Sequence, residues 1–168
     1  ISKVFTKNTQ GNVTISDLAG NTAKRYYKVS NIDKTAPVVN EVVYSPEVLT
    51  NTDVVVTMKL SEKVKEIEGW TLSENGLELS KTFTENTNGN IEIFDLAGNK
   101  VVAEYNVKNI DKEAPKPHST TYSPKTLTNG DVKVTIRVNE ELKPVEGWEL
   151  SEDKKAISKV FTKNTQGN

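Results

Sequence analysis

The chain has 168 residues, of which 27% are charged and 35% are hydrophobic, and its 22 basic residues nearly balance its 23 acidic ones. That balance lacks the surplus of Lys and Arg on which binding to nucleic acid or an anionic membrane depends, so we expect neither partner. The chain has no cysteine, which excludes disulfides, thiolate nucleophiles and Cys-ligated zinc, and no apolar run approaches the roughly 18 residues of a membrane-spanning helix.

An internal repeat organises the sequence. Several motifs return 78 positions later, namely D-L-A-G-N at 17–21 and 95–99, N-I-D-K at 31–34 and 109–112, Y-S-P at 44–46 and 122–124, and E-G-W at 68–70 and 146–148. The first twelve residues, Ile1 to Asn12, return unchanged as Ile157 to Asn168, two periods later. The sequence therefore consists of two periods plus twelve residues.

Proline-bearing segments at 32–37 and 110–115 predict linkers between the units, because the residue before a proline avoids the helical region. Boundaries placed there give the C-terminal part of one unit at 1–34, a complete unit at 35–112 and the N-terminal part of the next unit at 113–168. A unit of this length is too long for one turn of a solenoid and long enough for a small domain with its own core.

Alternating apolar residues predict the strands of each unit. Every second side chain is apolar in 54–60, and the copy at 132–138 places Lys133, Thr135 and Arg137 on the opposite face, as in a half-buried antiparallel strand. The same alternation predicts that Ile91 and Ile93 face inward. The candidate strands of the complete unit are 38–44, 54–60, 64–72, 77–84, 91–94 and 100–108.

Six short strands separated by turn residues, with no apolar 3.6-residue period, predict an all-β chain of tandem immunoglobulin-like β-sandwich domains. Trp70 and its copy Trp148 suit the space between two sheets, although a sugar-stacking platform is the alternative. The residues that we expect to be buried are Val54, Val56, Met58, Trp70, Phe83, Ile91, Ile93 and Tyr105.

The order D-L-A-G-N, a strand, then N-I-D-K-x-A-P resembles the bacterial Ig-like repeats found in tandem in large surface adhesins and other cell-wall-attached or secreted proteins. The resemblance covers the whole chain. It implies a structural spacer or stalk repeat of an extracellular protein at the bacterial cell surface or cell wall, supporting adhesion. The alternative is an Ig-like module that recognises a host protein or a glycan.

Enzymatic chemistry is not expected. His118 is the only histidine and Asn40 occupies its place in the other unit, so a catalytic role for it is not indicated. Nucleophile, metalloprotease and phosphate-loop motifs are missing. Glu68 and Glu146 raise one further possibility through the resemblance, because some cysteine-free domains of this kind form Lys-Asn isopeptide bonds beside an acidic side chain.

The D-L-A-G-N segment is interpreted first as a tight hairpin turn. Asp95 would accept backbone N–H bonds, Gly98 would supply a positive φ, and Asn99 tolerates the left-handed region. In an Ig-like sandwich this turn lies where the linker enters, so we expect Asp95 to lie near Asp33 and away from Asp111.

Two carboxylates with neighbouring oxygens, among them those of Asn31 and Asn99, would suit Ca²⁺, which prefers six to eight oxygen ligands. The resemblance also points to Ca²⁺ at such junctions. Asp33 and Asp95 are therefore the candidate metal ligands, and Asp17 and Asp111 are their equivalents in the adjoining units. We expect no cofactor to be required, and Ca²⁺ is the one candidate ion.

The two incomplete repeat units lead us to expect association between copies of the chain. Residues 113–168 supply the first strands of a unit but not its last two, whereas 13–34 are a pair of last strands. An open sandwich leaves an apolar face and unpaired backbone groups exposed, which is unfavourable. We expect neighbouring copies to associate head to tail, with 13–34 of one completing 113–168 of the next. The duplicated Ile1 to Asn12 would then compete with Ile157 to Asn168 for one strand position.

Overall fold

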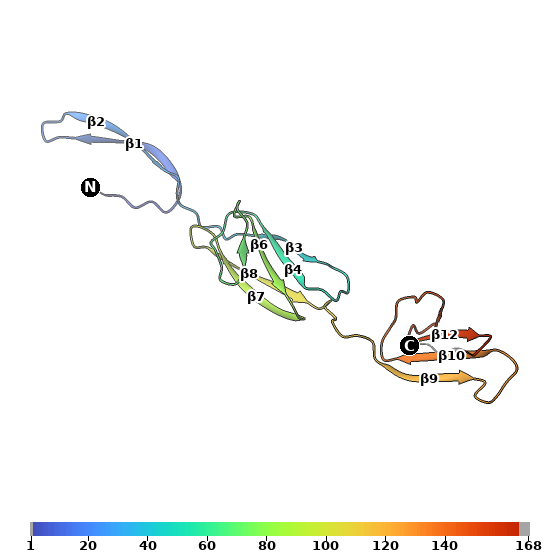
Figure 1. Cartoon of the computed structure of the whole chain (residues 1–168). Coiled ribbons are helices and arrows are strands. Elements are labelled where there is room, and N and C mark those ends of the chain that lie inside the picture. The colour runs from blue at the N-terminus through green and yellow to red at the C-terminus, as the bar shows by residue number, and fades with distance from the viewer. Residues whose placement is uncertain (1, 165–168) are drawn as a thin grey trace. The chain divides into compact units, whose positions relative to one another are not determined.

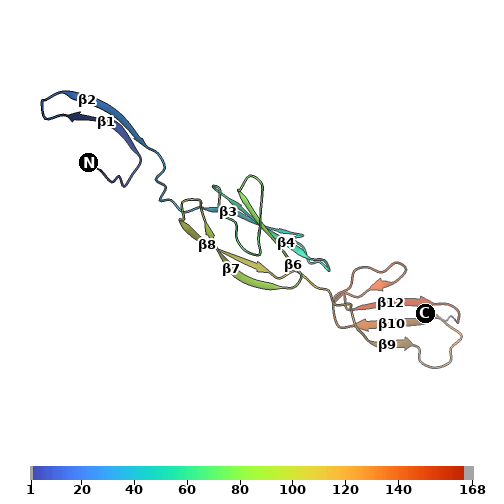
Figure 2. The same ribbon diagram turned by 60° about the vertical axis from the view of Figure 1, so that its left-hand side comes forward.

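The computed structural model describes residues 2–164, which form β-strands joined by turns and loops. The chain forms two compact units, Ile1–Asp111 and Lys112–Asn168. Figures 1 and 2 show the strands of each unit from two directions. The prediction of an all-β chain with antiparallel sheets is confirmed. No helix in the described part of the chain has the length and apolarity needed to cross a membrane.

Residues 35–111 of the first unit form two antiparallel sheets that pack face to face in a β-sandwich-like arrangement (Figure 1). One sheet has the order β3-β4-β6-β5. Its strands are β3 (Val39–Ser45), β4 (Val54–Leu60), β5 (Thr71–Leu72) and β6 (Glu78–Phe83). The second sheet is the hairpin of β7 (Thr87–Phe94) and β8 (Lys100–Val107).

The core lies between these two sheets. Val54, Val56 and Met58 of β4 are fully buried, as the alternating pattern predicts, and Ile91 and Ile93 of β7 pack opposite this sheet. Each such side chain contributes about 1.5 to 3 kcal/mol by leaving water. Burial of one sheet face against the other is therefore the main stabilising interaction of the unit.

Three aromatic side chains close one part of this core. The ring centroids of Trp70 and Tyr105 lie 5.7 Å apart, those of Phe83 and Tyr105 lie 5.0 Å apart, and those of Trp70 and Phe83 lie 6.3 Å apart. Phe83 is buried as predicted, but Trp70 and Tyr105 are only half-buried. The predicted burial is confirmed only in part for these two, because their rings pack against the core at its margin.

The predicted strand 64–72 is wrong in its extent, since only Thr71–Leu72 pair as β5. Gly69 has a φ of +75°, and the Trp70 N–H donates to the Ile67 carbonyl at 3.1 Å. This turn interrupts the extended conformation just before β5.

The predicted strand 91–94 is too short, because β7 begins at Thr87 and includes a run of Asn, Gly and Asn. Gly89 pairs with Tyr105 across the hairpin, and a Cβ at Gly89 would lie only 2.7 Å from the Tyr105 hydroxyl oxygen. The glycine therefore makes room for the aromatic ring, a use that turn propensity does not reveal.

The first unit also contains a hairpin of β1 (Thr9–Ser16) and β2 (Thr22–Val29). Its bounds and its register match those of β7 and β8 at an offset of 78 residues. Val13 and Ile15 are 47% and 51% exposed, whereas their equivalents Ile91 and Ile93 are 6% and 0% exposed. The hairpin thus keeps its backbone pairing without a covering sheet over these side chains.

The second unit contains one four-stranded sheet with the order β11-β12-β10-β9, which matches β5-β6-β4-β3. Its strands are β9 (Pro117–Ser123), β10 (Val132–Val138), β11 (Glu149–Leu150) and β12 (Ala156–Phe161). Within residues 112–164 no counterpart of the β7–β8 hairpin is present. Within those residues the apolar face of this sheet is therefore not covered by a second sheet.

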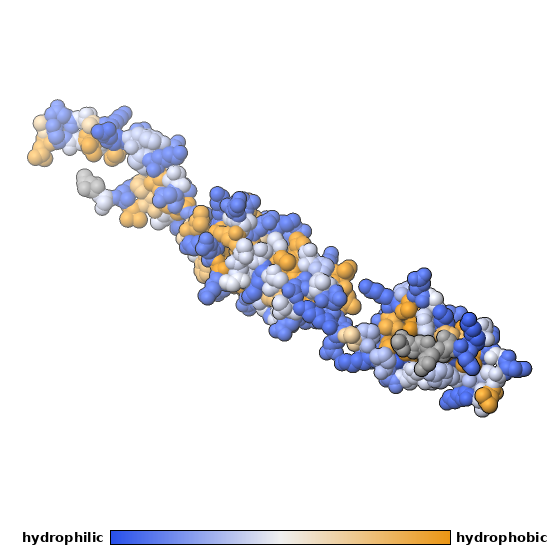
Figure 3. Space-filling view, in the orientation of Figure 1, coloured by the Kyte–Doolittle hydropathy of each residue, from blue (hydrophilic) through white to orange (hydrophobic). Residues whose placement is uncertain are grey.

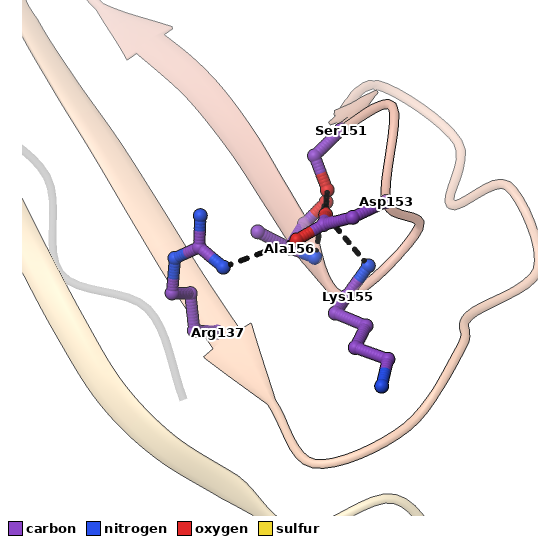
Figure 4. A network of polar contacts seen from close by, with 5 residues as sticks. All are labelled: Arg137, Ser151, Asp153, Lys155 and Ala156. Atoms are coloured by element: carbon purple, nitrogen blue, oxygen red, sulfur yellow. Dashed lines mark hydrogen bonds and ion pairs between the residues drawn. The ribbon is translucent and has the colours of Figure 1, made fainter.

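A polar turn connects β11 to β12 (Figure 4). The Ser151 hydroxyl donates to the Asp153 carboxylate, which also accepts the Lys155 N–H at 3.1 Å and an Arg137 guanidinium N–H at 3.3 Å. The Ala156 N–H donates to the Ser151 hydroxyl oxygen at 2.9 Å. These bonds fix the start of β12 through two side chains of the turn, Ser151 and Asp153, and one of β10, Arg137.

Replacing Trp70 with Ala should lower the free energy of unfolding of the complete sandwich by about 3 kcal/mol, because it removes a large ring from the aromatic cluster and leaves a cavity. Denaturant unfolding followed by far-ultraviolet circular dichroism measures this loss. Leu96→Ala is the matched control: Leu96 is 66% exposed at a turn, so its loss should change stability by less than about 0.5 kcal/mol. Equal effects of the two substitutions would show that Trp70 lies outside the core.

Candidate metal centre

The D-L-A-G-N turn after β7 positions the Asp95 carboxylate. Its Oδ1 accepts the N–H groups of Gly98 at 2.6 Å and Asn99 at 2.8 Å, and its Oδ2 accepts the Asn99 side-chain amide at 2.7 Å. Gly98 has a φ of +97°, which favours glycine, so the predicted hairpin turn is confirmed. Asn99 does not have a positive φ, so the left-handed role expected for it is wrong, and its side-chain hydrogen bonds explain its presence instead.

Three carboxylates converge beside this turn. Asp33 comes from the linker before β3, Glu62 follows β4, and Asp95 follows β7; an oxygen of each lies within 4.8 Å of the others. The Asn99 amide also donates to the Asp33 carbonyl at 3.3 Å, which ties the linker to the turn. Asp95 is 1% exposed, Glu62 is half-buried and Asp33 is exposed. The cluster therefore runs from the margin of the core to solvent.

No ion pair within residues 2–164 neutralises these three carboxylates. Burial acts to raise the pKa of Asp95, but hydrogen bonds from Asn99 and Gly98 outweigh it and lower the pKa. Burial, and then the negative charges of Asp33 and Asp95, raise the pKa of Glu62. The charged form of Glu62 is thus disfavoured within the cluster.

The other predicted residues lie elsewhere. Asp17 makes the same turn bonds as Asp95, to Asn21, but it is exposed, and those bonds lower its pKa. Asp111 lies at the opposite end of the complete unit's chain from Asp33, where its N–H donates to the Thr50 carbonyl at 2.8 Å. The structure therefore brings Asp33 and Asp95 together, and it places Asp111 in a different set of contacts.

Glu62 was not among the predicted ligands. A signal for it exists in the sequence, because Glu62 recurs as Glu140 at the same offset, two residues after the end of β4 and of β10. Residues that follow strands ending at the same end of a sandwich can lie close together. The repeat pattern in the sequence does not show, however, which of these loop side chains point toward one another.

The donor set suits a hard cation. Carboxylate oxygens are the ligands that Ca²⁺ and Mg²⁺ prefer, and neither imidazole nor thiolate is present in the cluster. An ion bound here would offset the mutual repulsion of the three charges.

Other residues with a suggested role lie in ordinary structural positions. Trp70 packs on Phe83 and Tyr105, which agrees with a core role and not with a sugar platform. His118 is exposed on β9. Glu68 and Glu146 are exposed.

No family model, no curated protein and no solved structure matches this chain.

Replacing Glu62 with Gln should raise the thermal midpoint at pH 7 in the absence of divalent cations, because it removes one of three neighbouring charges. The pKa of Glu62 is raised on folding, so protonation of Glu62 stabilises the folded state relative to the unfolded state. That stabilisation is lost as pH rises through the folded-state pKa. The gain in the variant should therefore shrink as pH falls below 4.5, the ordinary value for Glu.

Glu66→Gln is the matched control for this measurement, since Glu66 is an exposed acid of the same loop and lies outside the cluster. It should leave the pH dependence of the midpoint unchanged. An equal gain in both variants at pH 7 would mean that general charge reduction, and not repulsion within the cluster, is responsible.

Proposed function

We propose that this chain is a segment of a tandem array of Ig-like β-sandwich repeats that serves as a spacer or stalk of an extracellular bacterial surface protein and supports adhesion. The observation that carries the proposal is the recurrence of the same strands. Bounds, sheet order and register return at an offset of 78 residues, from β1–β2 to β7–β8 and from β3–β6 to β9–β12.

Repetition of one structural unit favours a spacer, because a stalk gains reach with each added unit whereas an enzyme gains little. The linker is also anchored to the domain that follows it. Pro37 is fully buried, and the Asp33 carbonyl accepts a hydrogen bond from Asn99. A linker held in this way transmits orientation from one unit to the next, as a stalk requires.

Calcium is part of the proposal at the carboxylate cluster. Asp33, Glu62 and Asp95 would hold the ion, and Ca²⁺ would join the linker to two loops of the following unit. The resemblance to adhesin repeats supports the same assignment. Cell-surface and cell-wall localisation belongs to the proposal on the same ground.

Adding Ca²⁺ should raise the thermal midpoint of the wild-type chain relative to the same chain in chelator, since an ion that binds only the folded state stabilises it. Asp95→Asn and Glu62→Gln should each abolish this shift. Asp17→Asn is the matched control, because Asp17 forms the same turn but does not belong to the carboxylate cluster, and it should retain the shift. Identical thermal midpoints with Ca²⁺ and with chelator in the wild type would mean that Asp95 binds no Ca²⁺ and serves only to form the hairpin turn.

A spacer should show no saturable binding to host proteins or glycans, whatever the number of repeats. Titration of chains with one and with two copies of residues 35–112 against immobilised host matrix proteins and glycans measures this directly. The maximum dimension from small-angle scattering should meanwhile grow with each copy. Saturable binding by a single copy would favour the ligand-recognition alternative instead.

A further inference from the structure

In the complete unit, the loop that follows β3 lies beside the segment that follows β8. Thr50 and Ile110 form a parallel bridge there. The Thr50 N–H donates to the Asn109 carbonyl at 2.8 Å, and the Asp111 N–H donates to the Thr50 carbonyl at 2.8 Å. The two segments therefore run in the same direction, although they lie far apart in the sequence.

The Asn109 side chain extends this contact. Its Nδ2 donates to the Pro46 carbonyl at 2.8 Å and to the Val48 carbonyl at 2.9 Å. Earlier along both segments, the Asn106 N–H donates to the Tyr44 hydroxyl oxygen at 3.0 Å. The hydrogen-bond partners thus advance together along the two segments, as they must where both segments run in parallel.

Hydrogen bonds, and not burial, hold the loop in this position. Val48 and Leu49 are 72% and 73% exposed, and hydrophobic residues are visible on the surface of the complete unit (Figure 3). Ile110, by contrast, is 7% exposed, and Asn86 binds its N–H at 2.9 Å and its carbonyl at 2.8 Å. The segment after β8 is therefore anchored in the core, and the loop is attached to that segment by hydrogen bonds.

This contact joins two of the motifs that recur with the 78-residue period. Y-S-P at 44–46 supplies a hydroxyl and a carbonyl acceptor, and N-I-D-K at 109–112 supplies the asparagine that donates to the loop. The carboxylate cluster uses neither Y-S-P nor this asparagine. The first N-I-D-K is bound in a similar way, because Asn8 binds the N–H and the carbonyl of Ile32 at 2.9 Å.

We propose that the hydrogen bonds between 44–50 and 106–111, here called the clamp, determine how strongly residues 35–111 resist unfolding when the chain is pulled through its two linkers. The inference rests on the stalk role, because a stalk transmits force along its length. Force enters at the linker before β3 and leaves at the linker after β8. It therefore pulls the first clamp segment by its N-terminal end and the second by its C-terminal end.

The parallel direction of the two segments decides what this force does. Parallel segments that are pulled from opposite ends slide past each other, so all the hydrogen bonds between them are stretched at once and must break together. In a hairpin whose two ends are pulled apart, by contrast, the bonds break one after another. The clamp therefore presents a high barrier to forced unfolding, and the rate of unfolding under force reports that barrier.

The full chain can be pulled across the complete unit alone. It has no cysteine, so Lys34→Cys and Ala114→Cys, both at exposed positions, supply two attachment points for optical tweezers. Unfolding rates are then measured at constant force. Release of roughly 250 Å of chain, at about 3.3 Å for each residue of 35–111, identifies the unfolding of this unit.

Asn109→Ala should raise the unfolding rate under force by about tenfold, because it removes the two hydrogen bonds to the loop carbonyls. Asn75→Ala is the matched control. It also removes two hydrogen bonds of an asparagine side chain, from the Ser73 hydroxyl at 2.7 Å and the Leu77 N–H at 3.0 Å, but in the turn between β5 and β6. It should change the unfolding rate under force by less than about twofold.

Tyr44→Phe tests the clamp with the ring retained, since it removes only the hydroxyl that accepts the Asn106 N–H. It should raise the unfolding rate under force by about twofold to tenfold, as loss of one hydrogen bond does. Unchanged rates in both Asn109→Ala and Tyr44→Phe would overturn the clamp, since β3 would then separate from β4 first. An equal rise in Asn109→Ala and Asn75→Ala would also overturn it, because general destabilisation would explain both.

These measurements separate the clamp from the stalk role. Saturable binding of a host protein or glycan by one copy of residues 35–112 would contradict the stalk role, yet the effect of Asn109→Ala under force would remain. Absence of that effect would contradict the clamp, while the growth of the maximum dimension with each added copy would still support the stalk. Pulling the wild type, Asn109→Ala, Asn75→Ala and Tyr44→Phe chains at one force therefore decides the proposal.

Discussion

The structure depends on the burial of one sheet face against another. An antiparallel strand with alternating apolar side chains can pair its backbone within one sheet, but its apolar face needs a second layer. In the complete unit Met58 and Ile93 are both fully buried because the β7–β8 hairpin lies on the four-stranded sheet. Where one layer is missing, the same strands keep their register while their side chains remain partly in water. Backbone pairing therefore needs only the strands of one sheet, whereas burial of the core needs a second sheet.

The same two-layer arrangement creates the carboxylate cluster. Packing the β7–β8 hairpin on β4 brings the turn that follows β7 beside the loop that follows β4, and the linker enters at that point. The charged form of Asp95 is stabilised by the hydrogen bonds of its turn, whereas burial and the charges of its two neighbours disfavour the charged form of Glu62. Acids held together in this way repel one another, so the protonation state of Glu62 is linked to the packing of the two sheets.

Much of the candidate site could be predicted from the sequence, because the Asp95 turn is a local motif. Asp, Gly and Asn at fixed spacing determine its hydrogen bonds whatever surrounds it, and Asp17 makes equivalent bonds to Asn21 in an exposed hairpin. The approach of Asp33 follows from the order of strands in a sandwich. Glu62 could not be predicted in the same way, since its position depends on how the loop after β4 turns toward the linker.

The sequence by itself determined the local features of this protein: the strands, their alternating faces, the hairpin turns and the period of 78 residues. These depend on short-range hydrogen bonding and on a side-chain period of two, which a single strand already contains. The tertiary structure alone decided that Trp70 lies at the margin of the core, that Gly89 belongs to a strand beneath Tyr105, and that Glu62 joins two aspartates. Each of these results from contacts between segments distant in sequence, where the packing of one side chain depends on the position of another.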